Sequence, residues 1–529
     1  MSFPKSFQRP EIVLALAFLG LIVLGAGLRL YDLTDQPIDF HPTRQLRGAI
    51  VARGMYYALD PSADDAARRQ AIAFWQSTGQ YEPSILEGLV ALSYLLLGEE
   101  QFWIARIFNT IFWIIGGAAL FELARRMSLD SLSQNSGQHA KAISKGVALL
   151  ALAFYLILPF SVQASRSFQP DPGMVMWIVL AALALYRWSE QKSWKWAILT
   201  GLFSGLAILT KAVAFYILAG AAGAVVLYTF GFLRTKPLFS PLLKIMGSAQ
   251  VWCMLLLTLA PAAIYYLAQG GRASEFFSSW TVDLAHLLLQ PRTYLRWLNL
   301  VGELMGFIAL LVGLVGVLIS KRRNQALLLG LWTGYILYGL LLPYQITTHS
   351  YYHLQLVPIL ALSLTPVAQL LFGYLMKQAR VWRFVFAGLT AGLVVFFAWQ
   401  ALVPLYAEDY RDEPAYWQTI ASYLPTDGKI VALTQDYGYR LMYYGWRKVV
   451  LWPNRGEQGV NQLRGSGKEF QQYFAKRAAG KSYFLVTAFR QFDDQPDLKE
   501  HLYANFPVLA EGPGYIIFDL IGSAQPGTQ

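Results

Sequence analysis

Long apolar runs separated by short polar loops fill the chain up to about residue 403. A helix needs about 20 apolar residues to cross the hydrocarbon core of a membrane. Runs near that length predict spanning helices at 11–29, 103–123, 146–164, 172–188, 195–210, 212–230, 245–268, 299–320, 325–343, 352–376 and 382–403. A shorter run at 84–98 carries Glu87 near its start, which favours an interfacial or re-entrant helix over a crossing. The pattern predicts a mainly α, polytopic membrane protein with about 11 transmembrane helices.

Beyond residue 403 the apolar runs become short and alternate with polar segments. "KIVALT" (429–434), "SYFLVTAF" (482–489) and "GYIIFDL" (514–520) are typical of buried strands, with helical patterns between them. We therefore expect a transmembrane domain over 1–403 and a small α/β domain over 404–529. Within the first, the polar loop 30–102 carries helical patterns at 43–58 and 63–77, and long ordered loops are usually functional.

Composition and charge support a membrane location and indicate an orientation. The chain is 55% hydrophobic and 14% charged, too apolar for a soluble protein of 529 residues. The net charge of +11 does not indicate nucleic-acid binding, because Lys and Arg cluster in short loops between apolar runs. If 84–98 does not cross, the basic clusters fall on one side of the membrane. We expect a plasma-membrane protein with a cytoplasmic N-terminus and an extracytoplasmic C-terminal domain.

Polar and ionisable residues gather at the predicted outer ends of several spans. They are Arg166 and Asp171 in "SRSFQPDP", Lys211 in "ILTKAV", and His349, Tyr351, Tyr352 and His353 in "THSYYHLQ". Ionisable groups at a membrane boundary are costly unless they are hydrated, paired or binding something. Individually, the Lys is also typical of snorkelling and the aromatics of an interfacial belt. Together, the convergent positions indicate a water-accessible site on the outer side.

The outer loop 30–102 offers a second set of candidate residues. Asp39 precedes His41 and Pro42, and Arg44 and Arg47 follow on a predicted helix, where their spacing places them on one face. Such a pair could bind a phosphate, while a nearby carboxylate could act as a general base. The alternative is a surface helix with ordinary arginines. The carboxylates of Asp39 and Asp171 together with His41 could also bind a divalent metal, although no ligand spacing demands one.

The order of these features resembles the GT-C superfamily of polyprenyl-phosphate-sugar glycosyltransferases. The likeness rests on the outer Asp-containing loop, "SRSFQPDP", "GLAILTKAVAFY" (205–216) and "HSYYHLQLVPILAL" (349–362), and it is nearest to protein O-mannosyltransferases and aminoarabinose lipid A transferases. It implies an enzyme that moves a sugar from a polyprenyl-phosphate donor to a protein, lipid or glycan acceptor on the outer side. It also implies Asp39 as the base, Asp171 as a second acidic site residue and Lys211 as a phosphate contact.

The sequence departs from the family pattern in the first outer loop. Family members commonly carry an Asp-Glu pair just after the position of "HPTRQ", where this chain has Thr43 and Arg44. Either Asp39 supplies the base through a shifted loop, or the chain is a non-catalytic scaffold derived from such an enzyme. A transporter of lipid-linked substrates is a further alternative, although we see no inverted repeat or matching pair of broken helices.

Overall fold

The structure is a computed structural model that describes Ser278 and residues 9–79, 82–132, 137–232, 239–268, 280–426, 429–463 and 469–522. Some basic residues behind the orientation argument, such as those in the loop 233–238, lie outside the described residues. The chain divides into two compact units. The first contains Met1–Leu33, Tyr81–Leu86 and Ile104–Ala407, and the second contains Thr34–Gln80, Glu87–Trp103 and Glu408–Gln529.

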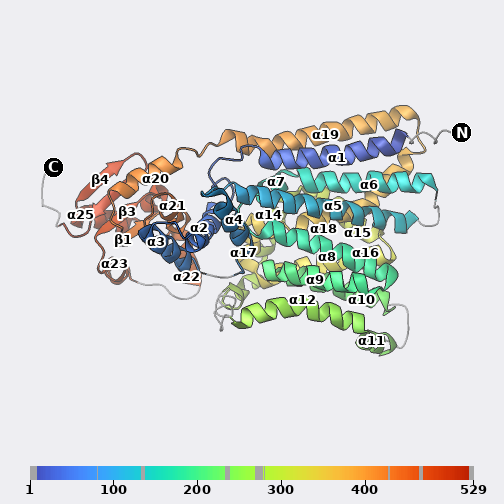
Figure 1. Ribbon diagram of the computed structural model, residues 1–529, viewed down its shortest axis with the longest axis horizontal. Helices are drawn as coiled ribbons and strands as arrows, with labels where there is room; N and C mark the ends of the chain where they lie inside the picture. The colour runs from blue at the N-terminus through green and yellow to red at the C-terminus, as the bar shows by residue number, and fades with distance from the viewer. Residues whose placement is uncertain are drawn as a thin grey trace. The chain divides into compact units, whose positions relative to one another are not determined.

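The first unit is helical, and Figure 1 shows its helices running side by side, with α1 next to α19. Its α-helices are α1 (Arg9–Leu30), α5 (Ile104–Leu132), α6 (Gln138–Ile157), α7 (Pro159–Arg166), α8 (Asp171–Gln191), α9 (Trp194–Thr210), α10 (Ala214–Thr229), α11 (Phe239–Met246), α12 (Ala249–Ala268), α14 (Pro291–Met305), α15 (Phe307–Ile319), α16 (Arg322–Leu341), α17 (Pro343–Thr348), α18 (Leu356–Leu375) and α19 (Arg380–Ala407). Two short 3-10 helices, η1 (Ala285–Leu289) and η2 (Ser350–His353), lie between them.

Among the described residues, seven helices are long and apolar enough to cross a membrane: α1, α5, α6, α8, α12, α18 and α19. The bent pair α14 and α15 raises the number to eight if it is one span. Gly306, with φ +84, separates these two helices, whose axes differ by 98°. The predicted spans at 195–210 and 212–230 form helices of only 17 and 16 residues, because the backbone turns extended at Lys211. The polytopic, mainly α fold is confirmed. The count falls below eleven because α9 and α10 are short and because α16, although 20 residues long, is not among the helices that are both long and apolar enough.

Glycines let α10 and α16 approach each other closely. A Cβ added to Gly330 or Gly334 would meet the backbone of α10 at Gly220 or at Tyr216 and Ile217. Small residues serve this purpose in membrane helix pairs, where close van der Waals packing replaces the hydrophobic effect. The α10–α16 contact holds the helix that follows Lys211 against the helix that carries Tyr335 and Tyr338.

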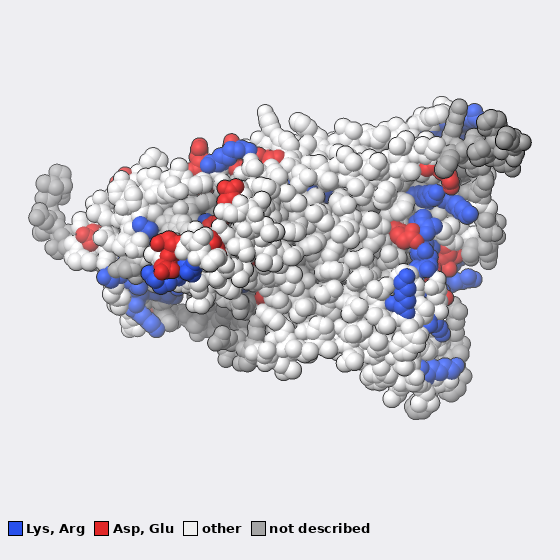
Figure 2. Space-filling model, in the orientation of Figure 1, with Lys and Arg blue, Asp and Glu red and all other residues white. Residues whose placement is uncertain are grey.

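A network of ion pairs joins the opposite end of the bundle, where α8 ends. The Glu190 carboxylate forms ion pairs with three arginines. The N–O distances are 3.3 Å to Arg126 of α5, 3.0 Å to Arg187 of its own helix and 3.9 Å to Arg323 of α16. Figure 2 shows basic and acidic side chains gathered at this end of the first unit. The network fixes the helix ends that lie farthest from Asp171.

The second unit contains a five-stranded sheet with strand order β2-β1-β3-β5-β4. Its strands are β1 (Ile430–Leu433), β2 (Val450–Leu451), β3 (Tyr483–Val486), β4 (Val508–Gly512) and β5 (Tyr515–Asp519). Strands β2, β1 and β3 are parallel, whereas β5 and β4 add in antiparallel fashion. The three strands predicted from sequence are β1, β3 and β5. The remaining two were missed because β2 has two residues and β4 is a largely exposed strand at the sheet edge.

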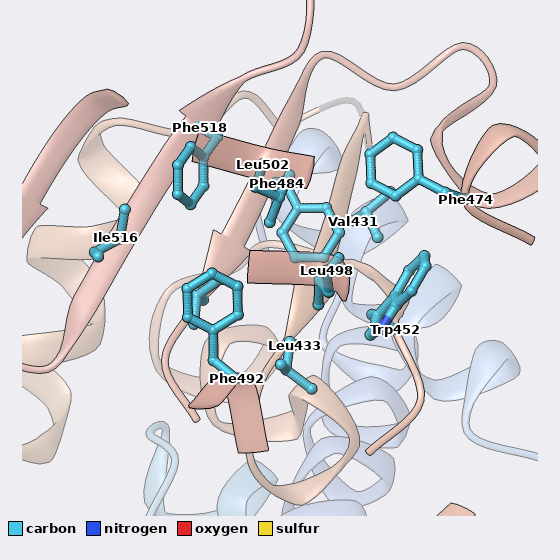
Figure 3. Packing of buried hydrophobic residues seen from close by; sticks show 11 residues of the cluster. Val431, Leu433, Trp452, Phe474, Phe484, Phe492, Leu498, Leu502, Ile516 and Phe518 are labelled. Atoms are coloured by element: carbon cyan, nitrogen blue, oxygen red, sulfur yellow. The ribbon is translucent and has the colours of Figure 1, made fainter. Parts of the chain in front are cut away.

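The core of this sheet is aromatic and aliphatic. Val431 and Leu433 of β1 pack with Phe484 of β3 and with Trp452 and Phe474, as Figure 3 shows. Helices α20 (Glu413–Ser422), α21 (Tyr439–Tyr444), α22 (Arg455–Leu463), α23 (Phe470–Ala478), α24 (Phe489–Asp493) and α25 (Pro496–Asn505) and the 3-10 turn η3 (Asp436–Gly438) complete the α/β part. The small α/β domain predicted from sequence is therefore present.

The second unit also contains most of the first polar loop, which the sequence prediction had left with the transmembrane domain. Its helices α2 (Pro42–Leu59) and α3 (Asp65–Ser77) match the predicted helical patterns. A further helix, α4 (Ile85–Leu97), has only 13 residues, which agrees with the expectation that 84–98 does not span. The loop and the α/β part form one body because buried polar contacts join them.

Arg53 is the most buried of these contacts. Its guanidinium donates to Glu100 at 2.8 Å and to the carbonyl of Tyr443 at 2.5 Å. It also lies 4.0 Å from the ring centroid of Tyr443 and 4.7 Å from that of Trp446. Burial alone would lower the pKa of Arg53, but the charge of Glu100 and the neighbouring tyrosine Tyr443 outweigh it and raise the pKa. The cation therefore stays charged and links α2, the α4–α5 connection and α21.

Candidate functional site

A buried ion pair joins Asp171 and Lys211 in the first unit. Asp171 begins α8, and Lys211 is the residue at which α9 ends. The Lys211 Nζ donates to Asp171 Oδ1 at 2.8 Å, and the two side chains are only 4% and 2% exposed. A carboxylate in the first turn of a helix is stabilised by the helix dipole, and the lysine compensates its remaining charge. The two groups therefore carry opposite charges that cancel, so the pair has no net charge.

Two tyrosine rings cover the ammonium of this pair. The Nζ of Lys211 lies 5.0 Å from the ring centroid of Tyr351 and 4.8 Å from that of Tyr352, both in η2. Tyr338 of α16 stacks on Tyr352 at 6.2 Å and 13°. Ammonium groups are attracted to the faces of aromatic rings. We call Asp171, Lys211, Tyr338, Tyr351 and Tyr352 the Lys211 cluster; the sequence had singled out all of them except Tyr338.

His353 anchors the turn that carries the two tyrosines. Its ring is fully buried, with Nδ1 at 2.6 Å from the hydroxyl of Tyr335 and Nε2 at 2.9 Å from the carbonyl of Ile346. The carbonyl can only accept, so Nε2 carries the proton and Tyr335 donates to Nδ1. Trp297 in turn donates to the Tyr335 hydroxyl at 3.1 Å. Both ring nitrogens are therefore used to fix η2.

His349 lies beside the same turn. Its Nδ1 is 2.7 Å from the Thr348 hydroxyl, and its ring packs edge-on against Tyr351 at 5.6 Å. The structure thus brings His349 close to Tyr351, as the motif "HSYYHLQ" suggested.

Arg166 and two further arginines hold the end of α1. Arg166 donates to the carbonyls of Tyr31 at 2.8 Å and Asp32 at 3.0 Å. Arg106 of α5 donates to Leu33 at 2.7 Å. Arg29 of α1 donates to the Ser165 hydroxyl at 2.6 Å. All three arginines are buried. They tie the start of "SRSFQPDP" and α5 to the end of α1 and the residues that follow it; only Arg166 was expected from the sequence.

The remaining predicted residues belong to the second unit. Asp39 Oδ1 accepts a hydrogen bond from Gln45 at 2.8 Å. His41 caps α2 with φ +48, a conformation that a histidine adopts more readily than most side chains. Arg44 is half-buried in the first turn. Arg47 donates to the carbonyl of Gly79 at 2.6 Å. It thus binds the end of α3, and a phosphate contact shared with Arg44 stays a prediction.

A carboxylate that the sequence reasoning missed contacts the "HPTRQ" loop. Asp436 follows β1 and accepts from the Thr43 hydroxyl at 3.1 Å and from Arg440 at 2.5 Å. It and Tyr437 have φ +51 and +56, a conformation that costs about 1–3 kcal/mol per residue and often marks functional sites. Burial lowers the pKa of Arg440, but Asp436 and Glu413 raise it overall. A carboxylate three residues after a buried strand was the available signal.

No group of three or more His, Cys, Asp or Glu side chains that could hold a metal ion occurs among the residues that the structure describes. At Asp171, one carboxylate oxygen accepts a hydrogen bond from the Lys211 ammonium.

Comparison with known proteins supports the GT-C likeness. Residues 82–249 match the family model described as dolichyl-phosphate-mannose-protein mannosyltransferase. This segment is about a third of the chain and contains Asp171 and Lys211, but neither Asp39 nor Tyr351. No curated protein matches the chain.

Solved structures resemble almost the whole chain in fold. ArnT from Cupriavidus metallidurans in the apo state aligns over 95% of this chain and 98% of its own, with a TM-score of 0.54 and 15% identity. The same protein bound to undecaprenyl phosphate covers 95% of this chain and 97% of its own, with a TM-score of 0.51 and 15% identity. The oligosaccharyltransferase of Archaeoglobus fulgidus, tethered to an acceptor peptide, covers 96% of this chain and 74% of its own, with a TM-score of 0.51 and 13% identity. The chain has the GT-C fold, and the predicted resemblance to that superfamily is confirmed.

Proposed function

We propose that the protein is an integral membrane glycosyltransferase that moves a sugar from a polyprenyl-phosphate donor to an acceptor on the extracytoplasmic side of the plasma membrane. The observation that carries the proposal is the buried Lys211–Asp171 pair under two tyrosine rings. Buried ionisable groups in membrane segments are expensive and usually functional. The fold and the family-model match support a glycosyltransferase, and one protein of similar fold binds undecaprenyl phosphate.

The reaction needs charge stabilisation at the phosphate. A nucleophilic atom of the acceptor attacks the anomeric carbon, the bond from that carbon to the phosphate oxygen breaks, and its electron pair stays on the phosphate. An ammonium has three donors, so Lys211 can donate to this oxygen while it keeps Asp171 as a partner. Preorganised positive groups of this kind stabilise the charge that develops in the transition state. Asp171 fixes the direction of the lysine, because its Oδ1 accepts a hydrogen bond from the ammonium.

The acceptor must also lose a proton, and Asp39 is the proposed base. The hydrogen bond from Gln45 holds Oδ1 and thereby sets the orientation of the carboxylate. We further propose His41 and Arg44 as substrate contacts and His349, Tyr351 and Tyr352 as lining of the donor site. Arg47, Arg166 and His353 hold backbone carbonyls, so we assign them supporting roles.

Release of free polyprenyl phosphate from a panel of polyprenyl-phosphate sugars tests the proposal. Purified wild-type protein with a membrane extract as acceptor source should release the carrier, and Asp39→Asn should lose release by about 100-fold or more, the usual contribution of a general base. Asp65→Asn is the matched control, because Asp65 lies in the same loop and is an exposed residue that pairs with Arg68. It should behave as wild type.

Other results would point to the alternatives. Release that survives in Asp39→Asn moves the base elsewhere, and Asp171→Asn and Asp436→Asn are then the next variants. No release with any donor contradicts the enzyme and favours the scaffold. A transporter would move labelled lipid across a sealed vesicle without cleaving the carrier.

A further inference from the structure

Buried polar atoms without hydrogen-bond partners occur beside the Lys211 cluster. Among the described residues, neither Asp171 Oδ2 nor the Tyr338 hydroxyl has a partner, and the same holds for both amide atoms of Gln169 and of Gln355. These side chains are 0–2% exposed. Leaving a buried polar group unpaired costs about 1–3 kcal/mol, and folded proteins contain few such groups. Six such atoms occur on four side chains that belong to the Lys211 cluster or lie within three residues of one of its members in the chain, and this indicates a binding site for a ligand.

Gln355 follows Tyr351 and Tyr352 of the Lys211 cluster along one helical stretch of backbone. Leu354 and Gln355 continue the helical conformation of η2 into α18. Residues three and four apart on a helix share a face, so Gln355 lies on the face of Tyr352 and Tyr351. Tyr338 stacks on Tyr352, which brings its unpaired hydroxyl to the same group of rings.

Gln169 lies in the turn before α8. Asn109 of α5 donates to the carbonyls of Ser167 at 2.5 Å and Gln169 at 3.1 Å. The Gln169 backbone N–H donates to Ser167 at 2.7 Å. The turn is thus fixed by its main chain, while the Gln169 amide, two residues before Asp171, keeps both its donor and its acceptor unused.

The chemistry of the unused atoms selects the ligand. Each glutamine amide offers both donors and an acceptor, the tyrosine hydroxyl can do either, and Asp171 Oδ2 only accepts. An ammonium cannot satisfy the amide donors, and a phosphate or carboxylate cannot satisfy the amide oxygens. Hydroxyl groups both donate and accept. The two charges of the Lys211 cluster, on Asp171 and Lys211, already compensate each other.

We propose that Gln169, Tyr338, Gln355 and Asp171 Oδ2 bind the sugar ring of the donor, and that this sugar is an uncharged polyhydroxyl one. The inference rests on the proposed function for the identity of the carrier. It adds which residues recognise the sugar, and it excludes amino sugars and uronic acids as the preferred donors.

Equilibrium binding without acceptor tests this subsite separately from transfer. The quantity is the ratio of two dissociation constants, for the bare polyprenyl phosphate and for the same carrier bearing a sugar. We expect wild-type protein to bind the neutral-hexose carrier about tenfold or more tighter than the bare carrier, since one or two buried hydrogen bonds supply that factor. Carriers with an amino sugar or a uronic acid should gain less.

Gln169→Leu and Gln355→Leu remove both polar atoms at nearly constant volume. Each should bring the ratio toward one and leave the affinity for the bare carrier unchanged. Each variant replaces an unpaired amide with an apolar group, so neither should lower the melting temperature. Replacing a glutamine that had a purely structural role would lower it. Gln250→Leu is the matched control: its amide is engaged by Trp188 and Lys192 at the far end of α8, and the ratio should stay at the wild-type value.

Three results would overturn the subsite: an unchanged ratio in both leucine variants, an equal loss of affinity for the bare carrier, or a larger ratio for a charged sugar in wild type. Transfer with acceptor present is scored independently. Sugar-dependent binding without transfer would overturn the proposed function and support the subsite, whereas transfer with a ratio insensitive to both glutamines would do the reverse.

Discussion

Replacing Lys211 by methionine should destabilise the first unit through the charge that it leaves behind. The ammonium lies 2.8 Å from Asp171 Oδ1, and neither side chain is more than 4% exposed. Removing one partner of such a pair costs about 3–5 kcal/mol, because an uncompensated charge stays buried. The position of Asp171 at the start of α8 offsets part of this cost, by about 0.3–2 kcal/mol. We therefore expect a loss of about 1–5 kcal/mol after this correction.

A double-mutant cycle separates this charge effect from packing. Lys211→Met, Asp171→Asn and the double variant would be heated in one detergent and lipid mixture, and the fraction that stays monodisperse would be measured. The double variant should be more stable than Lys211→Met alone, because no charge remains to be buried. All three should lose sugar transfer. If the losses of the single variants simply add in the double variant, the pair is not coupled and the reasoning fails.

Three further predictions concern packing and charge. Arg53→Ala should cost the second unit about 1.5–3 kcal/mol, because the partly buried Glu100 loses its charged hydrogen-bond partner. Protease sensitivity of the loop is the readout, and Arg53→Lys is the milder comparison. Burial among aromatic rings lowers the pKa of His501 below its ordinary value of about 6.5. The neutral ring should therefore contribute fully to the free energy of unfolding above about pH 6.5, and this contribution should be lost as the pH falls below that value. His501→Phe should flatten this dependence of the melting temperature on pH. Gly334→Ala should separate α10 from α16, because the new methyl group meets the Tyr216 backbone, and a melting temperature equal to wild type would contradict this close contact.

The sequence predicted the candidate site only where a polar residue interrupts an apolar run. Asp171, Lys211, Tyr351 and Tyr352 are visible for that reason, and the structure brings all four together. Tyr338 lies inside an apolar run, so its sequence position is typical of a core residue. The glutamines gave no signal, because an amide is informative only when its partners are known.

The contacts between residues that are far apart in the chain also depend on the tertiary structure. Arg47 and Arg166 have the sequence context of substrate-binding residues, yet their guanidinium groups bind main-chain carbonyls. Thr43 is close to Asp436 although 393 positions separate them. No local pattern encodes such a pairing.

The sequence by itself determined the membrane class, most helices and the α/β nature of the C-terminal part, because hydrophobic length and periodicity act locally and follow from burial of apolar surface. It also indicated the polar residues at helix ends, because such residues are costly in lipid. The tertiary structure decided which of them pair with each other, which hold carbonyls and which keep an unused donor or acceptor. Those outcomes depend on hydrogen-bond geometry over a few ångströms between helices that are distant in sequence, so no pattern along the chain specifies them.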